Sequence, residues 1–404
     1  MQPSNAKVVI VGAGFVLPGA RTPERFWSLA RSGTTATTDV DRFPVASYTG
    51  RRAGVVADDE LMLFPSRLRK RMDRFCQLSM VATHDALRDA GLTGELPSER
   101  TGIYVGNMFG GWTITEPSLR NLCQVGYTGV SPYIATSWFP TASQGQISIQ
   151  WNIKGFSKTV AADTASAAVA IGYAARMIAE GRADIMLAGG AEAPVTPYTY
   201  TFCETSGRLT AGDYAPFTDE ARGFQVGEGA VMFVLESESS ARARGAQILA
   251  EVAGFATGHA HSSDIFGRTG SARLARVGRA AVREAGLSPT DLDYVALDAQ
   301  GTVDADTSEA EAIGELLADA GGHVACSTAK PMCGHLLGAA PAVDVLAVVL
   351  GIQRSEIAPI AGIADSSHDL DLVVGQPRRH DIRAALVNAR GADGTIAALA
   401  LTAA

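Results

Sequence analysis

The stretch that decides the fold is Val160–Ala175, which reads VAADTASAAVAIGYAA. Its pattern predicts the end of a buried strand, a tight polar turn with Asp163 and Thr164 as capping residues, and a helix of small apolar residues. A side chain at such a turn lies at a helix N-terminus, where free N–H groups and the helix dipole stabilise negative charge. A cysteine there would become a reactive thiolate, but this chain has Ser166. A serine hydroxyl is far less acidic and needs a neighbouring base, so the turn suits a stronger nucleophile than the one it carries.

Length and composition restrict the class of protein. A chain of 404 residues exceeds the usual size of one domain, so we expect two domains or one duplicated unit. The formal net charge of −8 is spread along the chain, which argues against nucleic acid and an acidic membrane surface as partners. No charged-then-apolar leader opens the chain and no apolar run looks long enough to span a bilayer, so we expect a cytoplasmic protein.

Signals for metals and cofactors are weak. The five cysteines are scattered without CxxC spacing, which indicates a reducing compartment, mostly buried thiols and no zinc site. A Gly-Ala-Gly turn at 12–14 follows the first strand, but no acidic residue follows a second strand at the right place. That turn is therefore expected to be structural rather than a dinucleotide site. We expect neither a metal nor a cofactor.

The hydrophobic pattern indicates two successive passes of strand and helix. In the first pass we expect a strand and glycine turn over Lys7–Gly14, helices near Glu24–Arg31 and Cys76–Ala90, and strands near Arg100–Val105, Asp184–Gly190 and Val231–Leu235. In the second pass we expect a strand at Ile248–Phe255, a flexible loop at His259–Arg268, a helix at Ala272–Ala285, a strand at Tyr294–Leu297 and a helix at Ser308–Ala318. This alternation indicates parallel βαβ units.

The turn at Asp163–Ser166 resembles the nucleophile turn of β-ketoacyl synthases of the thiolase superfamily, Asp-Thr-Ala-Cys, with serine at the cysteine position. The resemblance covers nearly the whole chain. Gly223–Ala230 resembles another synthase motif, in which a buried Glu228 would need hydrogen-bonded partners. The resemblance implies an α/β protein with the thiolase fold, in which two similar βαβ halves, residues 1–240 and 241–404, pack as a five-layer α-β-α-β-α sandwich.

Two further synthase motifs carry the catalytic histidines. A condensing synthase needs a thiolate, two histidines and donors for the thioester oxyanion. The resemblance places the first histidine motif at Asp298–Thr302, where Gln300 replaces the histidine and does not titrate. The loop that follows is two residues shorter than in the usual synthase. The next motif, Lys330–Ala340, keeps the lysine of the family at Lys330 and its histidine at His335.

The last synthase motif normally supplies the oxyanion hole and a gating phenylalanine. Here it is Asn388–Gly394, in which both phenylalanines are absent and an arginine and an aspartate have entered. The nucleophile, one histidine and the gate loop are therefore altered together. Removing one member of a cooperating catalytic set already costs several orders of magnitude in rate, so the three changes point to lost condensation chemistry.

This combination resembles the chain length factor, also called ketosynthase β, of type II polyketide synthases. Those subunits lack the cysteine, have the shortened loop and end in Ala-Arg-Gly, as here at Ala389–Gly391, and Ser137–Ile149 also resembles their sequence. Ser166 in place of their usual glutamine, and the retained His335, indicate a less typical branch, such as one making polyenes or reduced chains. The resemblance leaves the catalytic positions Ser166, Gln300, Lys330 and His335 as vestiges.

In that family the subunit pairs with a catalytic ketosynthase α, and the acyl chain grows in a tunnel at their interface. The resemblance places the end of the tunnel at Trp112, Thr115 and Leu119, whose spacing puts them on one face if the stretch is helical. Pro117 fits a first helical turn, which leaves open whether Trp112 belongs to the helix. An ordinary core stripe is the alternative. Four further residues match positions that line the tunnel or reach the partner's pocket: Tyr133, Ile134, Tyr198 and Tyr200.

Two enzymatic alternatives remain open. Ser166 could be the nucleophile of an acyltransferase or hydrolase with His335 as its base, or the chain could decarboxylate a malonyl-carrier protein using Gln300, Lys330 and His335. The basic run Arg67–Arg71 is either a solvated helix start or a contact for the acidic surface of an acyl carrier protein. The expected partners are thus a ketosynthase α subunit, in a heterodimer, and an acyl carrier protein that delivers the malonyl or polyketide chain.

Overall fold

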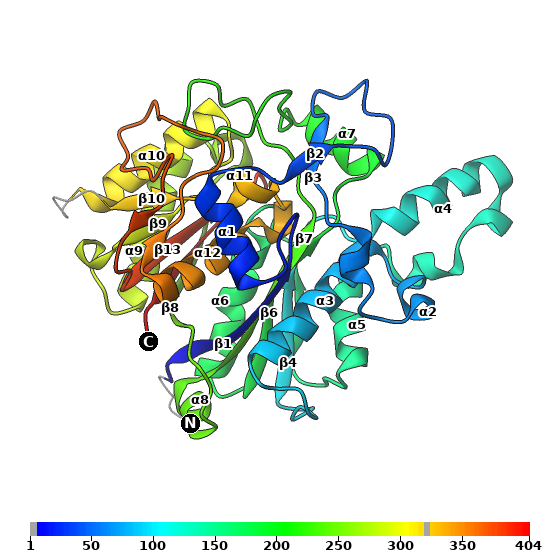
Figure 1. The fold of residues 1–404 in the computed structure, drawn as a ribbon, viewed down its shortest axis with the longest axis horizontal. Coiled ribbons are helices and arrows are strands. Elements are labelled where there is room, and N and C mark those ends of the chain that lie inside the picture. Colours follow the sequence, from blue (N-terminus) through cyan, green and yellow to red (C-terminus); the bar gives the residue numbers. More distant parts are fainter. Residues whose placement is uncertain (1–5, 319–323) are drawn as a thin grey trace.

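The computed structural model describes residues 6–318 and 324–404, in which ten strands form one large sheet (Figure 1). Their order is β10-β9-β13-β14-β8-β1-β7-β6-β4-β5. The strands are β1 (Val8–Val16), β4 (Thr101–Gly106), β5 (Ser157–Val160), β6 (Ile185–Glu192), β7 (Gly229–Ser237), β8 (Ala250–His259), β9 (Tyr294–Ala296), β10 (Ala325–Ser327), β13 (Ala384–Arg390) and β14 (Thr395–Thr402). Two small sheets pair β2 (Thr37–Asp39) with β3 (Arg52–Gly54), and β11 (Glu356–Ile357) with β12 (Arg378–Arg379).

The large sheet consists of two half-sheets with the same arrangement. In the first half, β4 pairs in parallel with β5 and β6, and β7 then joins β6 to β1 in antiparallel fashion. In the second half, β9 pairs in parallel with β10 and β13, and β14 joins β13 to β8. Within the large sheet, the two half-sheets are joined by the pairing of β1 with β8, at Val9 with Glu251 and Ile10 with Ala250. This confirms the expected duplication of a βαβ unit.

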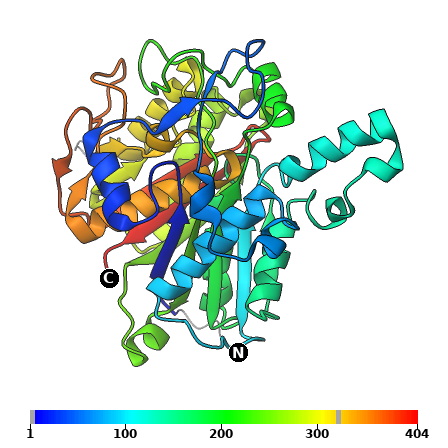
Figure 2. The ribbon, with the colours of Figure 1, turned by 45° about the vertical axis from the view of Figure 1, so that its right-hand side comes forward.

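Helices cover both faces of each half and produce five layers (Figures 1 and 2). Helices α3 and α5 lie outside the first half-sheet, α9 and α10 lie outside the second, and α6 and α12 lie between the two. The longer helices are α1 (Pro23–Ser32), α3 (Arg74–Asp89), α4 (Trp112–Val125), α5 (Ala142–Gln150), α6 (Ser166–Ala179), α7 (Pro197–Thr205), α9 (Arg268–Glu284), α10 (Val303–Leu317) and α12 (Ala340–Arg354). The shorter ones are α2 (Ser66–Arg69), α8 (Glu238–Ala243) and α11 (Lys330–Cys333).

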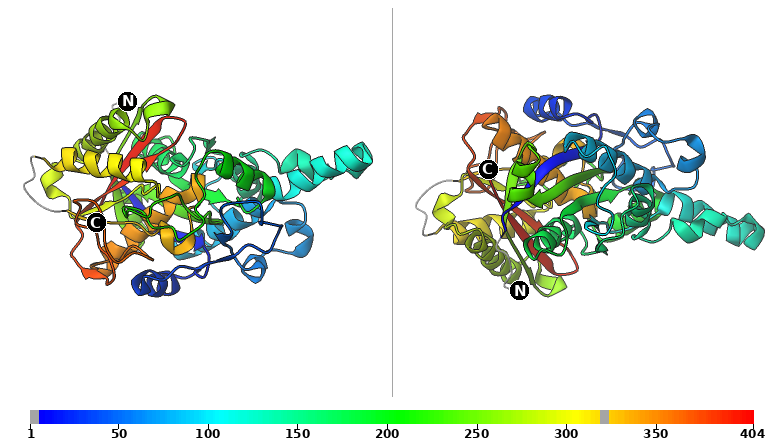
Figure 3. Two further views of the ribbon diagram at one scale, coloured as in Figure 1. Left: turned by 90° about the horizontal axis from the view of Figure 1, so that it is seen from above. Right: turned by 90° about the horizontal axis from the view of Figure 1, so that it is seen from below.

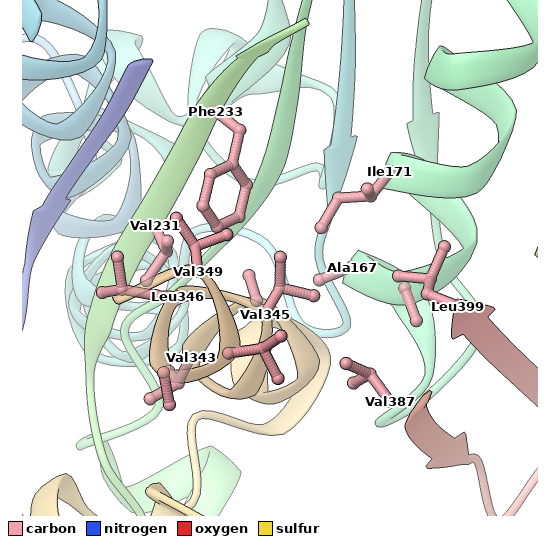
Figure 4. Packing of buried hydrophobic residues seen from close by; sticks show 14 of the residues in the cluster. Ala167, Ile171, Val231, Phe233, Val343, Val345, Leu346, Val349, Val387 and Leu399 are labelled. Carbon is pink, nitrogen blue, oxygen red and sulfur yellow. The ribbon is translucent and has the colours of Figure 1, made fainter. Parts of the chain in front are cut away.

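The alternation of side chains along the strands explains why each half needs helices on both faces. In β1, Val8 and Ile10 belong to the central core, whereas Val9 and Val11 belong to the outer core under α3. Successive strand residues point to opposite faces, so a strand that is apolar at every position must be covered twice. Figure 4 shows the central layer, where side chains of α12 pack between β7 and the pair β13 and β14.

A long apolar helical stretch, Leu337–Arg354, lies in this central layer. It is long and apolar enough to cross a membrane by length and composition, contrary to our expectation that no such run exists. However, 83% of it is buried inside the protein. Its apolar character therefore follows from its position between two half-sheets, where most of it is shielded from water.

Two parts of the first half face outward. Helix α4 projects from the body as an arm, visible at the right of Figure 1 and from above and below in Figure 3. Strand β5 is an edge strand of the large sheet and is partly exposed. The prediction of a buried strand before the turn is therefore wrong for the isolated chain. The region His259–Arg268, expected to be a flexible loop, contains the end of β8, a short 3₁₀ turn and the start of α9.

Candidate functional site

Ser166 is the first residue of α6 and is fully buried. Its hydroxyl donates a hydrogen bond to the carbonyl oxygen of Asp163 at 2.6 Å and accepts one from the N–H of Ala162 at 2.9 Å. The expected caps are wrong, because Ala165 occupies the N-cap position without a side-chain bond. The serine hydroxyl closes the turn itself, so its proton is held by the backbone rather than by a general base.

The two expected capping residues bind elsewhere. Asp163 has a left-handed φ of 47°, and its carboxylate accepts from the N–H of Thr164 at 2.6 Å and from Arg208 Nη1 at 3.1 Å. The hydroxyl of Thr164 donates to the backbone carbonyl of Arg390. The turn before α6 is therefore tied to the end of β13 and to the segment after α7.

Gln300 joins three of the sequence motifs in one buried cluster. Its amide nitrogen lies 3.2 Å from both carboxylate oxygens of Asp298 and 3.3 Å from the Arg390 carbonyl oxygen. The same nitrogen lies 3.3 Å from the hydroxyl oxygen of Thr164. Two amide hydrogens are thus shared among several acceptors, and the glutamine acts as a hydrogen-bonded filler that carries no charge.

Arg390 is the largest fully buried side chain of the described residues. Its Nε donates to Asp298 at 2.9 Å, its Nη2 donates to the Ala305 carbonyl at 3.0 Å, and its Nη2 lies 3.6 Å from Glu309. Its guanidinium carbon lies 5.2 Å from the ring centre of Phe266. The carboxylates compensate the charge of the buried cation. The sequence showed that an arginine had entered this motif, but it did not predict that the arginine would form ion pairs inside the protein.

Lys330 begins α11 and is also buried. Its ammonium donates to the carboxylate of Asp344 and to the carbonyl of Leu297 at 2.7 Å. Asp344 in turn accepts from the hydroxyl of Thr328 at 2.9 Å. The lysine charge is therefore used inside the fold, where it holds β9, α11 and α12 together.

His335 is completely buried, and one of its two ring nitrogens is already used as an acceptor. Its Nδ1 accepts the N–H of Leu337 at 3.0 Å, so the single proton of the neutral ring is assigned to Nε2. Burial, together with the charges of Lys330 and Arg208, lowers the pKa of His335 well below its ordinary value. Nε2 has no hydrogen-bond partner among the described residues. The ring, stacked on Phe224, thus offers one N–H donor and no free lone pair for a base.

Sequence reasoning missed Glu192, the last residue of β6. Its side chain accepts from the N–H groups of Met108 and Phe109, and burial raises its pKa to about 8. The carboxyl is therefore mostly protonated at pH 7. An acidic residue that ends an otherwise apolar strand was the available signal, because an unpaired carboxylate is rarely buried without a reason.

Three of the expected tunnel residues lie on α4, and they differ in their exposure to solvent. Trp112 is the first residue of α4, and Pro117 lies inside the helix, which settles the question of whether Trp112 is helical. The ring of Trp112 stacks on Tyr198 of α7 with 3.5 Å between ring centres and 13° between planes. Thr115 is buried, whereas Leu119, one turn further along the arm, is 44% exposed.

The structure separates Tyr200 from this group. Tyr200 is fully buried and packs edge-on against Phe43 and Tyr48, with ring centres 5.1 Å and 5.7 Å away, and burial raises its pKa. Tyr133 and Ile134 lie on a 3₁₀ turn, Pro132–Thr136, that contacts α4. The guanidinium carbon of Arg71 lies 5.8 Å from the ring centre of Tyr133. The basic run Arg67–Arg71 therefore ends next to this 3₁₀ turn.

The arm carries an apolar surface that the chain itself does not cover. Exposed large apolar side chains lie on α4, on the turns that follow it and on α5; they are Leu119, Leu122, Val125, Tyr127, Tyr133, Trp138 and Ile149. Exposed apolar side chains are more frequent at protein interaction sites than on other protein surfaces. Of the five cysteines, only Cys123 on this arm is exposed, and none of them forms a disulfide.

Known protein families and individual relatives match most of this chain. Models of the N-terminal and C-terminal domains of beta-ketoacyl synthases match residues 5–241 and 249–364. The chain belongs to the β-ketoacyl synthase family. Within this family it is 36% identical over 406 residues to "Putative polyketide beta-ketoacyl synthase 2" of Streptomyces coelicolor, covering 98% of this chain and 94% of that protein. It is 32% identical to 3-oxoacyl-[acyl-carrier-protein] synthase 2 of Staphylococcus aureus, with 98% of both chains covered.

Solved structures confirm the thiolase fold of this synthase-family chain. The structure titled "The ishigamide ketosynthase/chain length factor" matches with a TM-score of 0.90 and 27% identity, over 99% of this chain and 100% of that chain. Among the described residues of this family member, no group of three or more His, Cys, Asp or Glu side chains is arranged to hold a metal ion.

Proposed function

We propose that this chain is a chain length factor, a non-condensing ketosynthase-like subunit. It pairs with a catalytic ketosynthase α subunit and shapes the interface tunnel that sets the length of a polyketide or polyene chain. The observation that carries the proposal is the hydrogen-bonded cluster of Gln300, Asp298 and Arg390, which occupies the synthase motifs for a catalytic histidine and the gate. These side chains bind one another, and Gln300 places an amide, which does not titrate, where the synthase motif has its histidine.

The state of Ser166 supports the loss of condensation. A serine nucleophile needs a base within hydrogen-bond reach to take its proton. Here the hydroxyl proton of Ser166 is directed at the Asp163 carbonyl, and the Nδ1 lone pair of His335 is occupied by the Leu337 N–H. The acyltransferase or hydrolase alternative would require both hydrogen bonds to be broken before the first proton transfer.

The exposed apolar surface of α4 supports a partner subunit. A solvent-exposed arm with Leu122, Val125 and Tyr127 on it gains stability only when another protein covers it. The edge strand β5 leaves one side of the sheet unpaired within the described chain. A heterodimer with a ketosynthase α subunit accounts for both, and it agrees with the pair named in the structure of the ishigamide ketosynthase/chain length factor.

The same surface supports the tunnel assignment. The stacked rings of Trp112 and Tyr198 and the half-exposed Leu119 would meet the partner, and their bulk would limit the growing chain. Tyr200 is too deeply packed to contribute directly. The basic run Arg67–Arg71 lies beside this surface and offers the complementary charge for an acidic acyl carrier protein.

One observation favours a second candidate, the decarboxylation of a malonyl-carrier protein. His335 has an unused Nε2–H donor, which could stabilise the enolate oxygen formed when carbon dioxide leaves. Such a reaction needs a donor and a pocket but no nucleophile. It would be lost in a His335→Ala variant and unaffected by Ser166→Ala, and a free-standing assay of carbon dioxide release distinguishes it from the subunit role.

The test is reconstitution with a type II ketosynthase α subunit, acyl carrier protein and malonyl-CoA. We expect the pair to make product with Ser166→Ala in this chain and to make none when the catalytic cysteine of the α subunit is replaced by alanine. Leu119→Ala should lengthen the products, whereas Tyr200→Phe, a matched core control, should not. Product formation by this chain alone, or its loss with Ser166→Ala, would overturn the proposal.

A further inference from the structure

The base of α4 is held by one buried carboxylate. Asp73 precedes α3 and is fully buried. Its Oδ2 accepts the hydroxyl of Thr113 at 2.7 Å and the N–H of Ile114 at 2.8 Å, both in the first turn of α4. The N-terminal N–H groups of a helix have no partner within the helix, so a carboxylate that receives one of them holds the helix end in place.

The surroundings leave this contact little freedom. A side chain added at Gly111, just before α4, would lie 2.0 Å from the Ser137 carbonyl and 2.8 Å from Asp73 Cβ. The hydroxyl of Thr113 also accepts the N–H of Arg74 at 3.2 Å, so Asp73 and Thr113 connect α3 to α4 in both directions. Burial raises the pKa of Asp73 to about 6, so the carboxylate is mostly ionised at neutral pH and accepts both hydrogen bonds.

Beyond this base, few contacts hold the arm. Among the described residues, the other hydrogen bonds between α4 and the body are the N–H of Tyr198 to Glu116 at 3.2 Å and the indole N–H of Trp112 to the Phe109 carbonyl at 2.9 Å. The outer half of the helix is exposed from Leu119 to Val125. A helix rises 1.5 Å per residue, so a tilt of about 10° at Trp112 would displace Leu119 by roughly 2 Å.

We propose that Asp73 is a positioning residue for product length, which sets the placement of Thr115 and Leu119 by clamping the first turn of α4. The proposal rests on the proposed function, because it assumes that these residues end the tunnel. In this proposed role, Asp73 does not contact the acyl chain. It acts through Thr113 and Ile114, and its loss would let the arm adopt more than one orientation.

A capping role for α3 must be separated from this positioning role. Asp73 Oδ1 also accepts the N–H of Phe75 at 3.3 Å, so Asp73→Asn changes the cap of α3 as well. Thr113→Val keeps Asp73 and the cap but removes the hydroxyl donor at almost constant shape. Asp89→Asn is the matched control, because Asp89 is an exposed carboxylate at the opposite end of α3 that accepts the N–H of Ala13 at 2.9 Å.

Two measurements test the proposal. Hydrogen–deuterium exchange on the chain alone should show amides 113–119 exchanging about tenfold faster in Asp73→Asn and Thr113→Val than in the parent, because one hydrogen bond to a charged group is lost. Asp89→Asn should leave them unchanged. In the reconstituted pair, Thr113→Val should broaden the product range toward longer chains while total product stays within about twofold, the change expected of a loosened gate rather than of unfolding.

The outcomes separate the two proposals. Faster exchange without any change in product length, while Leu119→Ala does lengthen products, would refute the positioning role and leave the subunit role intact. Unchanged product length in Leu119→Ala and Thr113→Val together would refute the tunnel itself. Unchanged exchange in both variants at Asp73 and Thr113 would show that the carboxylate does not hold α4.

Discussion

The ion pair between Arg390 and Asp298 gives the sharpest prediction for stability. Arg390→Leu removes a fully buried cation and leaves the Asp298 carboxylate without its partner, and both side chains are no more than 2% exposed. Breaking a buried pair in this way costs about 3–5 kcal/mol of unfolding free energy. The double variant Arg390→Leu with Asp298→Asn removes both charges and should recover most of this loss.

The matched control is an ion pair on the surface. Arg242 and Glu238 lie one helical turn apart on α8 at 2.7 Å, with the arginine side chain 62% exposed. An exposed pair of this kind contributes less than about 1 kcal/mol, so Arg242→Leu should have a small effect. Denaturant unfolding followed by circular dichroism and by tryptophan fluorescence measures all four proteins.

The pattern among the variants decides the matter. We expect a large loss for Arg390→Leu, a much smaller loss for the double variant, and almost none for Arg242→Leu. A loss in Arg390→Leu no greater than in the surface control would refute the view that this pair fills and holds the altered synthase site. A double variant as unstable as Arg390→Leu would also refute it, because removing the second charge would then recover none of the loss.

Three further predictions concern the site and the arm. Burial raises the pKa of Glu192 to about 8, so this group stabilises the fold below its ordinary pKa near 4.5 and the contribution is lost as pH rises through about 8. Between pH 5 and pH 8, the free energy of unfolding should therefore fall by roughly 3 kcal/mol less in Glu192→Gln than in the parent protein. Equal slopes in the two proteins would contradict this. Ser166→Ala should leave reconstituted activity within about twofold, because an alanine keeps the helix start and removes only a turn-closing hydroxyl. Trp112→Ala and Leu119→Ala should lengthen products of the complex without abolishing activity, measured by mass spectrometry of released chains, and an unchanged product profile in both would count against the tunnel assignment.

The main elements were predictable because they depend on local patterns. The helix expected at Cys76–Ala90 is α3, Arg74–Asp89, and the strand expected at Arg100–Val105 is β4, Thr101–Gly106. Continuous apolar runs between turns of glycine and polar residues identify such elements in one chain. The motif order then implied the thiolase fold, which the family match and the structural neighbour confirm.

The details of the site were not predictable because they depend on contacts between distant segments. The inward pairing of Arg390 needs Asp298, 92 residues earlier in the chain. The position of Tyr200 in the core follows from Phe43 and Tyr48, which the local pattern around Tyr200 cannot reveal. The caps at Asp163 and Thr164 failed because Arg208 and Arg390 from other segments compete for them. Propensity gives way wherever tertiary partners are available.

The measurement that tests the central claim most directly is the intact mass of the purified chain after incubation with malonyl- and acyl-carrier protein. We expect no acyl adduct on this chain, because the Ser166 hydroxyl is hydrogen-bonded to its own turn and has no base. The acyl-carrier protein should also stay intact. An adduct that maps to Ser166 and disappears in Ser166→Ala would contradict the claim and make this protein a serine acyl-enzyme.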